Sequence, residues 1–218
     1  MGVGLNDEDT YVFARDFSMT QGNRGWYYME AANGSYQNMT WDDSQKKWKG
    51  SGAFNLIWAP GSMHPDGNDT VLAWKAPKAG TVQVVGNPKK ANLGNDGVNV
   101  KILKGSTQVW PGSGWQFIGG SDSTGVSHNV TIQVKKDEMI YFVLNKNGNN
   151  YNDGTSWNPL ITYNVVEKYS LTSDFSSVQG SRGWYYLETA STGYQQMTWD
   201  SSVNRWKGCL LYTSPSPR

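Results

Sequence analysis

The sequence predicts an all-β protein: a two-sheet antiparallel β-sandwich, jelly-roll-like, plus a truncated second copy of its opening part. Four separate segments alternate apolar and polar residues with a period of two, as half-buried strands do. The 218 residues include 11 Trp, 12 Tyr and 25 Gly, which favours strands joined by turns. No helical periodicity of useful length interrupts this pattern. Many short strands between turn clusters are typical of a sandwich.

The domain organisation follows from an internal repeat. The segment 16–50 returns at 174–208 with about 22 of 35 positions identical and a constant offset of about 158 residues. Such an offset is the period of a module, and it leaves room for only one complete copy. We therefore expect a complete module at 11–166 and the truncated start of a second copy at 167–208.

The two ends of the chain are expected to lie outside these modules. Residues 1–10, MGVGLNDEDT, are small and acidic and are interpreted as a linker. Residues 209–218, CLLYTSPSPR, resemble the in-frame translation of a sequencing adapter, so we interpret them as the non-native tail of a metagenomic fragment. The only cysteine lies in that tail, which leaves a module without disulfides.

The strands are placed in chain order by their alternation and by turn residues such as Asn33-Gly34 and Pro60-Gly61. The expected strands are 11–17, 25–31, 36–41, 70–76, 81–86, 98–103, 126–134, 139–144 and 160–166. The clearest four place their apolar side chains on one face, which must then be buried against a second sheet. The side chains expected in that core are Val82, Val84, Val100, Ile102, Ile132, Val134, Ile140, Phe142 and Leu144.

The charge pattern argues against two classes of partner. Lys and Arg total 19 against 18 Asp and Glu, and no basic run exceeds two residues. We therefore expect neither nucleic acid nor an anionic membrane surface as a partner. No apolar stretch reaches the ~18 residues of a membrane span, and the first residues lack the pattern of a signal peptide.

Aromatic rings of the repeated segment form the first candidate site. Flat rings with a polar tip stack on the C–H faces of sugars, while carboxylates accept hydrogen bonds from hydroxyl groups. The expected ligand-binding residues are Trp26, Tyr28, Glu30, Tyr36, Trp41 and Trp48. The same rings also suit a sandwich core, and the sequence leaves both interpretations open. A glycan platform requires at least two exposed rings on one side of the sandwich among Trp26, Tyr28, Trp41, Trp58, Trp110, Trp115 and Trp157.

The loop 145–158 is the candidate metal site. Its expected calcium ligands are Asn147, Asn152 and Asp153. Calcium takes six to eight oxygen ligands including several carboxylates, and this loop offers one. A structural calcium and a ligand-free Asn/Gly turn therefore both stay open, and no other cofactor is expected.

The two histidines, His64 and His128, do not suggest a metal centre, because zinc needs three or four protein ligands and no cysteine is available. His64, in the motif MHP, is expected to cap a loop by hydrogen bonding. His128 is expected on the face opposite the neighbours of Val130 or at a sheet edge.

A family resemblance adds to this picture. The motifs GWYY, YxxMTWD, WKG, MHP, VLAWKAP, AGTVQVVG, GNDGVNVKI, KKDEMIYFVL and WNPLITY follow one another in this order. The series resembles the β-sandwich modules, similar to carbohydrate-binding modules, that occur in tandem in large secreted bacterial proteins. The resemblance implies polysaccharide binding, an extracellular or cell-surface location and neighbouring modules in the same polypeptide.

Catalysis is not expected from this chain. No Asp/Glu pair sits in an apolar setting suited to a glycosidase, and there is no nucleophile elbow or phosphate-binding glycine loop. The leading hypothesis is a non-catalytic polysaccharide-binding module that uses aromatic stacking. The alternatives are a structural spacer or adhesin module whose rings are all core and, third, a fragment of a polysaccharide-active enzyme.

Overall fold

A computed structural model describes residues 9–32, 34–163, 171–190 and 193–208. The chain divides into two compact units, Met1–Asn164 and Val165–Arg218, which we call the first and the second unit. The predicted linker up to residue 8 and the predicted tail from 209 lie outside the described residues. No helix in the described part of the chain is long and apolar enough to cross a membrane.

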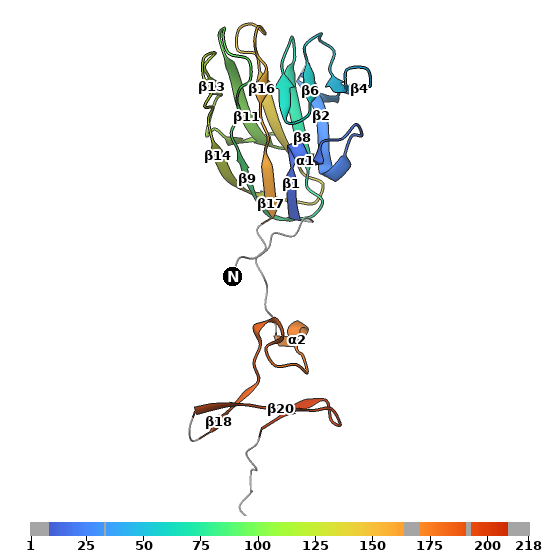
Figure 1. The fold of residues 1–218 in the computed structure, drawn as a ribbon, viewed down its shortest axis with the longest axis vertical. Coiled ribbons are helices and arrows are strands. Elements are labelled where there is room, and N and C mark those ends of the chain that lie inside the picture. The colour runs from blue at the N-terminus through green and yellow to red at the C-terminus, as the bar shows by residue number, and fades with distance from the viewer. Residues whose placement is uncertain (1–8, 33, 164–170, 191–192, 209–218) are drawn as a thin grey trace, which may run out of the picture. The chain divides into compact units, whose positions relative to one another are not determined.

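The first unit is a sandwich of antiparallel strands (Figure 1). Its elements are β1 (Thr10–Val12), α1 (Phe13–Asp16), η2 (Asn23–Gly25), β2 (Trp26–Ala32), β3 (Ser35–Asn38), β4 (Thr40–Asp42), β5 (Lys47–Lys49), β6 (Leu56–Trp58), β7 (Ser62–His64), β8 (Asp69–Lys75), β9 (Gly80–Gly86), β10 (Lys89–Lys90), β11 (Val98–Lys104), β12 (Thr107–Trp110), β13 (Gln116–Ile118), β14 (His128–Val134), β15 (Met139–Asn145), β16 (Thr155–Ser156) and β17 (Leu160–Tyr163).

These strands form three sheets. The main sheet has the order β12-β11-β15-β8-β2-β3, with β13 also on β11. The flank sheet has the order β1-β17-β9-β14, and the end sheet has the order β10-β16-β7-β6-β5-β4. Both smaller sheets pack against the main sheet: Trp74 meets Tyr163 of the flank sheet, and Tyr28 stacks on Trp48 of the end sheet. The all-β antiparallel sandwich is thus confirmed.

The predicted core is confirmed as well. All nine predicted side chains are buried, with exposed fractions of 0 to 4%. Val82 lies opposite Ile132 in the flank sheet, and Ile102 lies opposite Phe142 in the main sheet. The period-two pattern therefore identified the buried face correctly in each of these strands.

The start of the module differs from the expectation. The first strand is shorter than 11–17, because the chain turns into the short helix α1 after Val12. The Asp16 carboxylate accepts a hydrogen bond from the Val12 N–H at 2.9 Å and closes this turn, while Phe13 is fully buried. His128 is the first residue of β14, which is an edge strand of its sheet as expected, yet its side chain is only 3% exposed. It lies on the same face as Ile132, because residues two apart on a strand share a face.

The second unit repeats the opening elements of the first. Its elements are α2 (Leu171–Asp174), η3 (Ser181–Gly183), β18 (Leu187–Ala190), β19 (Gly193–Gln196), β20 (Thr198–Asp200) and β21 (Arg205–Lys207). The four strands form two hairpins, β18 with β19 and β20 with β21. Trp199 lies opposite Trp206 in the second hairpin, as Trp41 lies opposite Trp48 in the first unit.

Candidate functional site

Most of the predicted aromatic set belongs to the core. Trp26 and Tyr28 are fully buried, and Trp48 is 4% exposed. Tyr28 and Trp48 stack with ring centroids 4.6 Å apart, and the Tyr28 hydroxyl accepts a hydrogen bond from the Ser18 N–H. A ring without exposed surface cannot stack on a sugar, so these three rings stabilise the sandwich instead of forming a platform.

The remaining two predicted rings are half-buried. Tyr36 stacks on Tyr141 with centroids 4.1 Å apart. Trp41 packs against the core, and its indole N–H donates to Asp43 at 3.3 Å. Elsewhere, Trp115 is 37% exposed, with the Lys101 ammonium over its ring at 3.9 Å. Of the seven rings named for a platform, Trp157 is fully buried like Trp26 and Tyr28. The expectation of two exposed rings on one side stays a prediction for the other four, Trp41, Trp58, Trp110 and Trp115.

Glu30 has a positioning role in the structure. Its carboxylate is 5% exposed and accepts hydrogen bonds from the Ser51 N–H, the Ser51 hydroxyl and the Asn68 amide at 3.0–3.1 Å. These bonds hold the segment that follows β5, which leads to Phe54. The Cβ of any residue at Gly50 would lie 2.5 Å from a Glu30 oxygen, so this turn requires glycine.

A solvent-open pocket of the first unit lies where the loop before β6, the end of β7 and the loop after β15 meet. It has a volume of about 230 Å³ and is lined by Phe54, His64, Asn150, Tyr151 and Asn152. Phe54 is 54% exposed and Tyr151 is 74% exposed. Phe54 also contacts the His64 ring, with centroids 5.7 Å apart. The pocket therefore combines two exposed aromatic rings with two side-chain amides.

Asp66 joins the two walls of this pocket. One carboxylate oxygen accepts a hydrogen bond from the Phe54 N–H at 2.9 Å, and the other accepts one from the Asn150 amide at 2.8 Å. Both oxygens are therefore occupied by groups that position the pocket. Since Asp66 lies between β7 and β8, it links the loop before β6 to the loop after β15.

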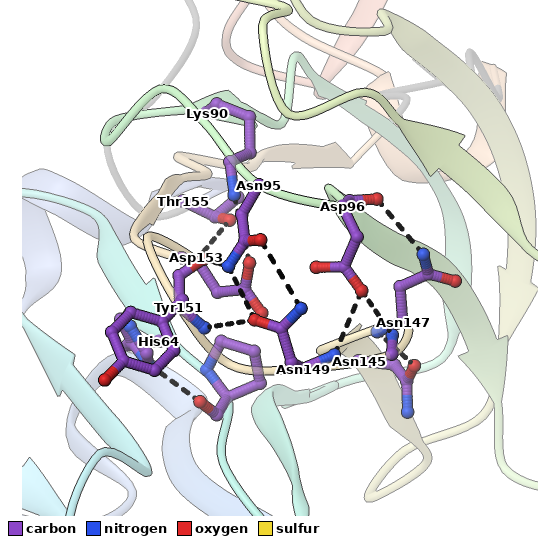
Figure 2. Close-up of polar contacts among 12 residues, drawn as sticks. His64, Lys90, Asn95, Asp96, Asn145, Asn147, Asn149, Tyr151, Asp153 and Thr155 are labelled. Carbon is purple, nitrogen blue, oxygen red and sulfur yellow. Dashed lines mark hydrogen bonds and ion pairs between the residues drawn. The ribbon is translucent and has the colours of Figure 1, made fainter.

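The loop that carries Tyr151 is held by asparagines, as Figure 2 shows. The Asn95 amide donates to Asn149 at 2.6 Å and to the Tyr151 carbonyl at 3.1 Å, and the Tyr151 N–H donates to Asn149 at 3.0 Å. The Asp96 carboxylate accepts from the N–H groups of Gly148 and Asn149. The backbone at Tyr151 is thus fixed while its ring points away from the network (Figure 2).

A buried ion pair anchors the end of the same loop. The Lys90 ammonium lies 3.1 Å from the Asp153 carboxylate, and both side chains are fully buried. Burial raises the pKa of Asp153 to about 6, an effect that Lys90 opposes and that the nearby charge of Asp96 reinforces. One oxygen of Asp153 and one of Asp96 are buried without a hydrogen-bond partner.

The predicted calcium ligands are brought together only in part. The Asn147 side chain is already used, because it donates to the Asp96 carbonyl at 3.1 Å and accepts from Asn99 at 3.0 Å. Asn152 is exposed at the pocket, and Asp153 faces Lys90. Among the described residues, no three His, Cys, Asp or Glu side chains gather in a way that could hold a metal ion.

His64 is neutral in this environment. Its Nδ1 lies 2.7 Å from the Pro65 carbonyl oxygen, which can only accept, so Nδ1 carries the proton. Burial lowers the pKa of His64. The expected loop contact of His64 is thus present, and the ring also lines the pocket.

Sequence reasoning missed Phe54 and Tyr151 as candidate contact residues. Both lie in segments without a strand pattern, where exposure depends on how distant loops meet. One signal was present: Tyr151 is the only aromatic residue in the Asn/Gly stretch 145–155. A large ring in a polar loop has no local core to fill, which favours a contact role.

Comparisons with known proteins find similar solved structures. No family model and no curated protein matches this sequence. CBM35 from Paenibacillus barcinonensis is 13% identical over 71% of this chain and 98% of its own, with a TM-score of 0.31. CBM51 from Clostridium perfringens GH95, solved in complex with methyl-galactose, is 10% identical over 69% of this chain and 99% of its own, with a TM-score of 0.34.

A third similar structure is a family 35 carbohydrate binding module from Clostridium thermocellum. It is 12% identical over 70% of this chain and 92% of its own length, with a TM-score of 0.30. At such identities and TM-scores these likenesses carry no functional argument, which must come from the pocket itself.

Proposed function

We propose that the first unit is a non-catalytic carbohydrate-binding module whose contact site is the pocket between Phe54 and Tyr151. The observation that carries this proposal is the exposure of the two rings, 54% for Phe54 and 74% for Tyr151, within one pocket. Aromatic rings are costly to leave in water, and a pocket that exposes two of them is suited to an apolar ligand face. Sugars present such faces through their C–H groups.

The polar groups of the pocket complement this stacking. The amides of Asn150 and Asn152 offer both donors and acceptors, which suits sugar hydroxyl groups because a hydroxyl both donates and accepts. Neutral His64 adds no charge. With a volume of about 230 Å³, the pocket is at the small end of ligand sites, so one or two sugar units fit and a longer chain must extend outside.

The pocket itself supports a binding role more than a catalytic one. Glycosidases use two carboxyl groups across a cleft, one as acid and one as base or nucleophile. Asp66 adjoins the pocket, and its two oxygens accept hydrogen bonds from the Phe54 N–H and the Asn150 amide. An extracellular location, a secreted bacterial parent protein and neighbouring modules are parts of the same proposal.

The spacer or adhesin alternative has its own supporting observation. The repeated rings Trp26, Tyr28 and Trp48 are core, as that alternative requires. The two hypotheses differ at the pocket, because a pure spacer has no use for exposed rings at Phe54 and Tyr151.

Affinity electrophoresis of the chain in gels that contain single polysaccharides tests the proposal. Tyr151→Ala and Phe54→Ala should each weaken the retention by the best polysaccharide about tenfold, which corresponds to about 1.4 kcal/mol. Phe117→Ala is the matched control, because Phe117 is 50% exposed and does not line the pocket. Equal retention of all four proteins, or no retention by any of a broad set of plant, algal and bacterial glycans, would favour the spacer function.

For calcium, we propose that the ammonium of Lys90 takes the place of a cation beside Asp153. A buried positive charge 3.1 Å from the carboxylate repels an incoming metal ion. The melting temperature should then be the same in calcium and in a chelator. An increase of several degrees in calcium would instead assign the two unpaired oxygens of Asp96 and Asp153 to a bound ion.

A further inference from the structure

The second unit keeps the internal contacts of the segment that it repeats. Its Tyr186 and Trp206 rings stack with centroids 4.6 Å apart, the same distance as for the equivalent rings of the first unit. The Trp206 indole N–H donates to the Ser176 carbonyl at 2.9 Å, and the equivalent bond of the first unit is also 2.9 Å. Gln179 bonds to the Tyr186 carbonyl at 2.8 Å, again as in the first copy. These contacts form within the opening segment alone.

One difference separates the two copies. In the first unit β2 starts at Trp26 and pairs with β8 (Asp69–Lys75) from Trp26 to Ala31. In the second unit the equivalent positions 184–186 are not in a strand, and β18 begins only at Leu187. Among the described residues, β18 pairs with β19 and with no other strand. The place that β8 occupies in the first unit is thus open, and we call this side of residues 184–190 the open edge.

The backbone groups of the open edge can be assigned from the known bonds. The Tyr186 N–H donates to Gln179, and its carbonyl accepts from the Met197 N–H, so both groups point toward β19. Backbone groups alternate in direction along a strand. The N–H and carbonyl groups of Leu187 and Thr189 therefore point toward the open edge. Those of Tyr185 are assigned to the same side by equivalence with Tyr27, which lies opposite Ala73 of β8.

The side chains at this edge are also uncovered. Tyr27 and Met29 are half-buried in the first unit, whereas their equivalents Tyr185 and Leu187 are 59% and 44% exposed in the second. An edge whose backbone groups pair with no other described strand, and whose apolar side chains are exposed, is a template for a further strand.

We propose that the open edge binds an extended segment with the sequence character of β8, in the antiparallel register that β2 and β8 already show. In the first unit Trp26 lies opposite Trp74, Tyr27 opposite Ala73 and Met29 opposite Val71. The offset of the repeat places Trp184, Tyr185 and Leu187 at the corresponding positions. The partner is a strand that is apolar on both faces, supplied by another part of a modular protein of this type.

The shapes at this edge favour β8 over a second copy of the same edge. In the β2–β8 pair the bulky Tyr27 faces the small Ala73. Two copies of the open edge in antiparallel contact would pair residues that are mostly large, and among the residues that can lie opposite Tyr185 neither edge offers one as small as alanine. A β8-type strand places alanine at this position.

The backbone directions also supply a matched pair of probes. The backbone N–H and carbonyl groups of Tyr27, Met29 and Ala31 point toward β8. Those of their partners in β8 point back toward β2, and this includes Ala73. The backbone groups of Leu72 point the other way, toward β15. A labelled peptide of residues 67–77, GNDTVLAWKAP, is titrated with the full chain. N-methylation of Ala73 blocks a backbone bond to the open edge. N-methylation of Leu72 removes a donor on the other side and is the control.

The binding of the peptide should weaken at least tenfold with the methyl group at Ala73 and much less with the one at Leu72. Amide hydrogen exchange locates the contact: the peptide should slow exchange at Tyr185, Leu187 and Thr189 and leave β8 of the first unit unchanged. Equal effects of the two methyl groups, no saturable binding, or protection outside residues 184–190 would overturn the proposal. Protection that appears without peptide and rises with protein concentration would overturn it too, because it would assign the edge to a second copy of the chain.

Discussion

Acid should weaken the first unit through His128, a side chain that the structure holds in its neutral form. Its Nε2 accepts a hydrogen bond from the Trp157 indole at 3.0 Å, and its Nδ1 lies 3.3 Å from the Val84 carbonyl, which can only accept. Protonation would put a second N–H against the indole N–H. Burial lowers the pKa of His128 from 6.5 to about 4, and no charged side chain contributes to this shift.

The sign and the size of the effect follow from linkage. Because the folded pKa lies below the unfolded one, the stability that His128 provides is complete above pH 6.5 and is lost as pH falls toward 4. The difference of about 2.5 pKa units corresponds to about 3 kcal/mol, since each unit is worth about 1.4 kcal/mol. About 2 kcal/mol of this should already be lost at pH 5.

The assay compares urea unfolding of the natural chain and of His128→Gln by far-ultraviolet circular dichroism between pH 7 and pH 5. Glutamine keeps a donor and an acceptor but does not titrate, so the difference in unfolding free energy between the two proteins should shrink by about 2 kcal/mol toward pH 5. The comparison is needed because Asp153, with its raised pKa, acts in the opposite direction. His64, whose pKa is lowered, acts in the same direction as His128 and cancels in the difference. Parallel curves for the two proteins would refute the reasoning.

Three further predictions concern stability, and thermal unfolding measures each of them. Lys90→Met leaves the buried Asp153 carboxylate without its partner and should cost about 3–5 kcal/mol at pH 7; the double variant with Asp153→Asn should recover most of it, and no recovery would contradict the ion-pair account. Gly86→Ala places a Cβ 2.5 Å from His128 Nε2 and should cost about 2 kcal/mol, whereas Gly112→Ala, with open space around it and no positive φ, serves as the comparison for an added methyl group. Deletion of residues 169–218 should leave the melting temperature of the first unit unchanged, because its core cluster contains described residues of that unit only; a large decrease would show that the second unit is part of the same fold.

Local pattern explains which parts of the fold were predictable. Val82 and Ile132 were assigned to the core because a strand alternates its faces whatever its neighbours are, and the structure buries both. The short strands β5, β6, β7, β10, β12, β13 and β16 were missed, because two to four residues carry no measurable period. Some of them pair with partners far along the chain, as Lys89 does with Ser156.

The candidate site was less predictable for the same reason. A tryptophan or tyrosine suits a core and a sugar platform equally, so the sequence could not decide between them for Trp26 or Tyr28. The strand and sheet that cover a ring decide it: Trp48 of the end sheet covers Tyr28, and β8 is missing over Tyr185.

By itself, then, the sequence determined the fold class, the buried faces of the long strands and the internal repeat, since each of these is a periodicity or an identity along one chain. Only the tertiary structure decided which aromatic rings meet solvent. Phe54 and Tyr151 share a pocket because Asp66 holds the Phe54 N–H and the Asn150 amide, groups that lie 12 and 84 residues away from it. No local rule encodes contacts over such separations, because they depend on the packing of the whole sandwich.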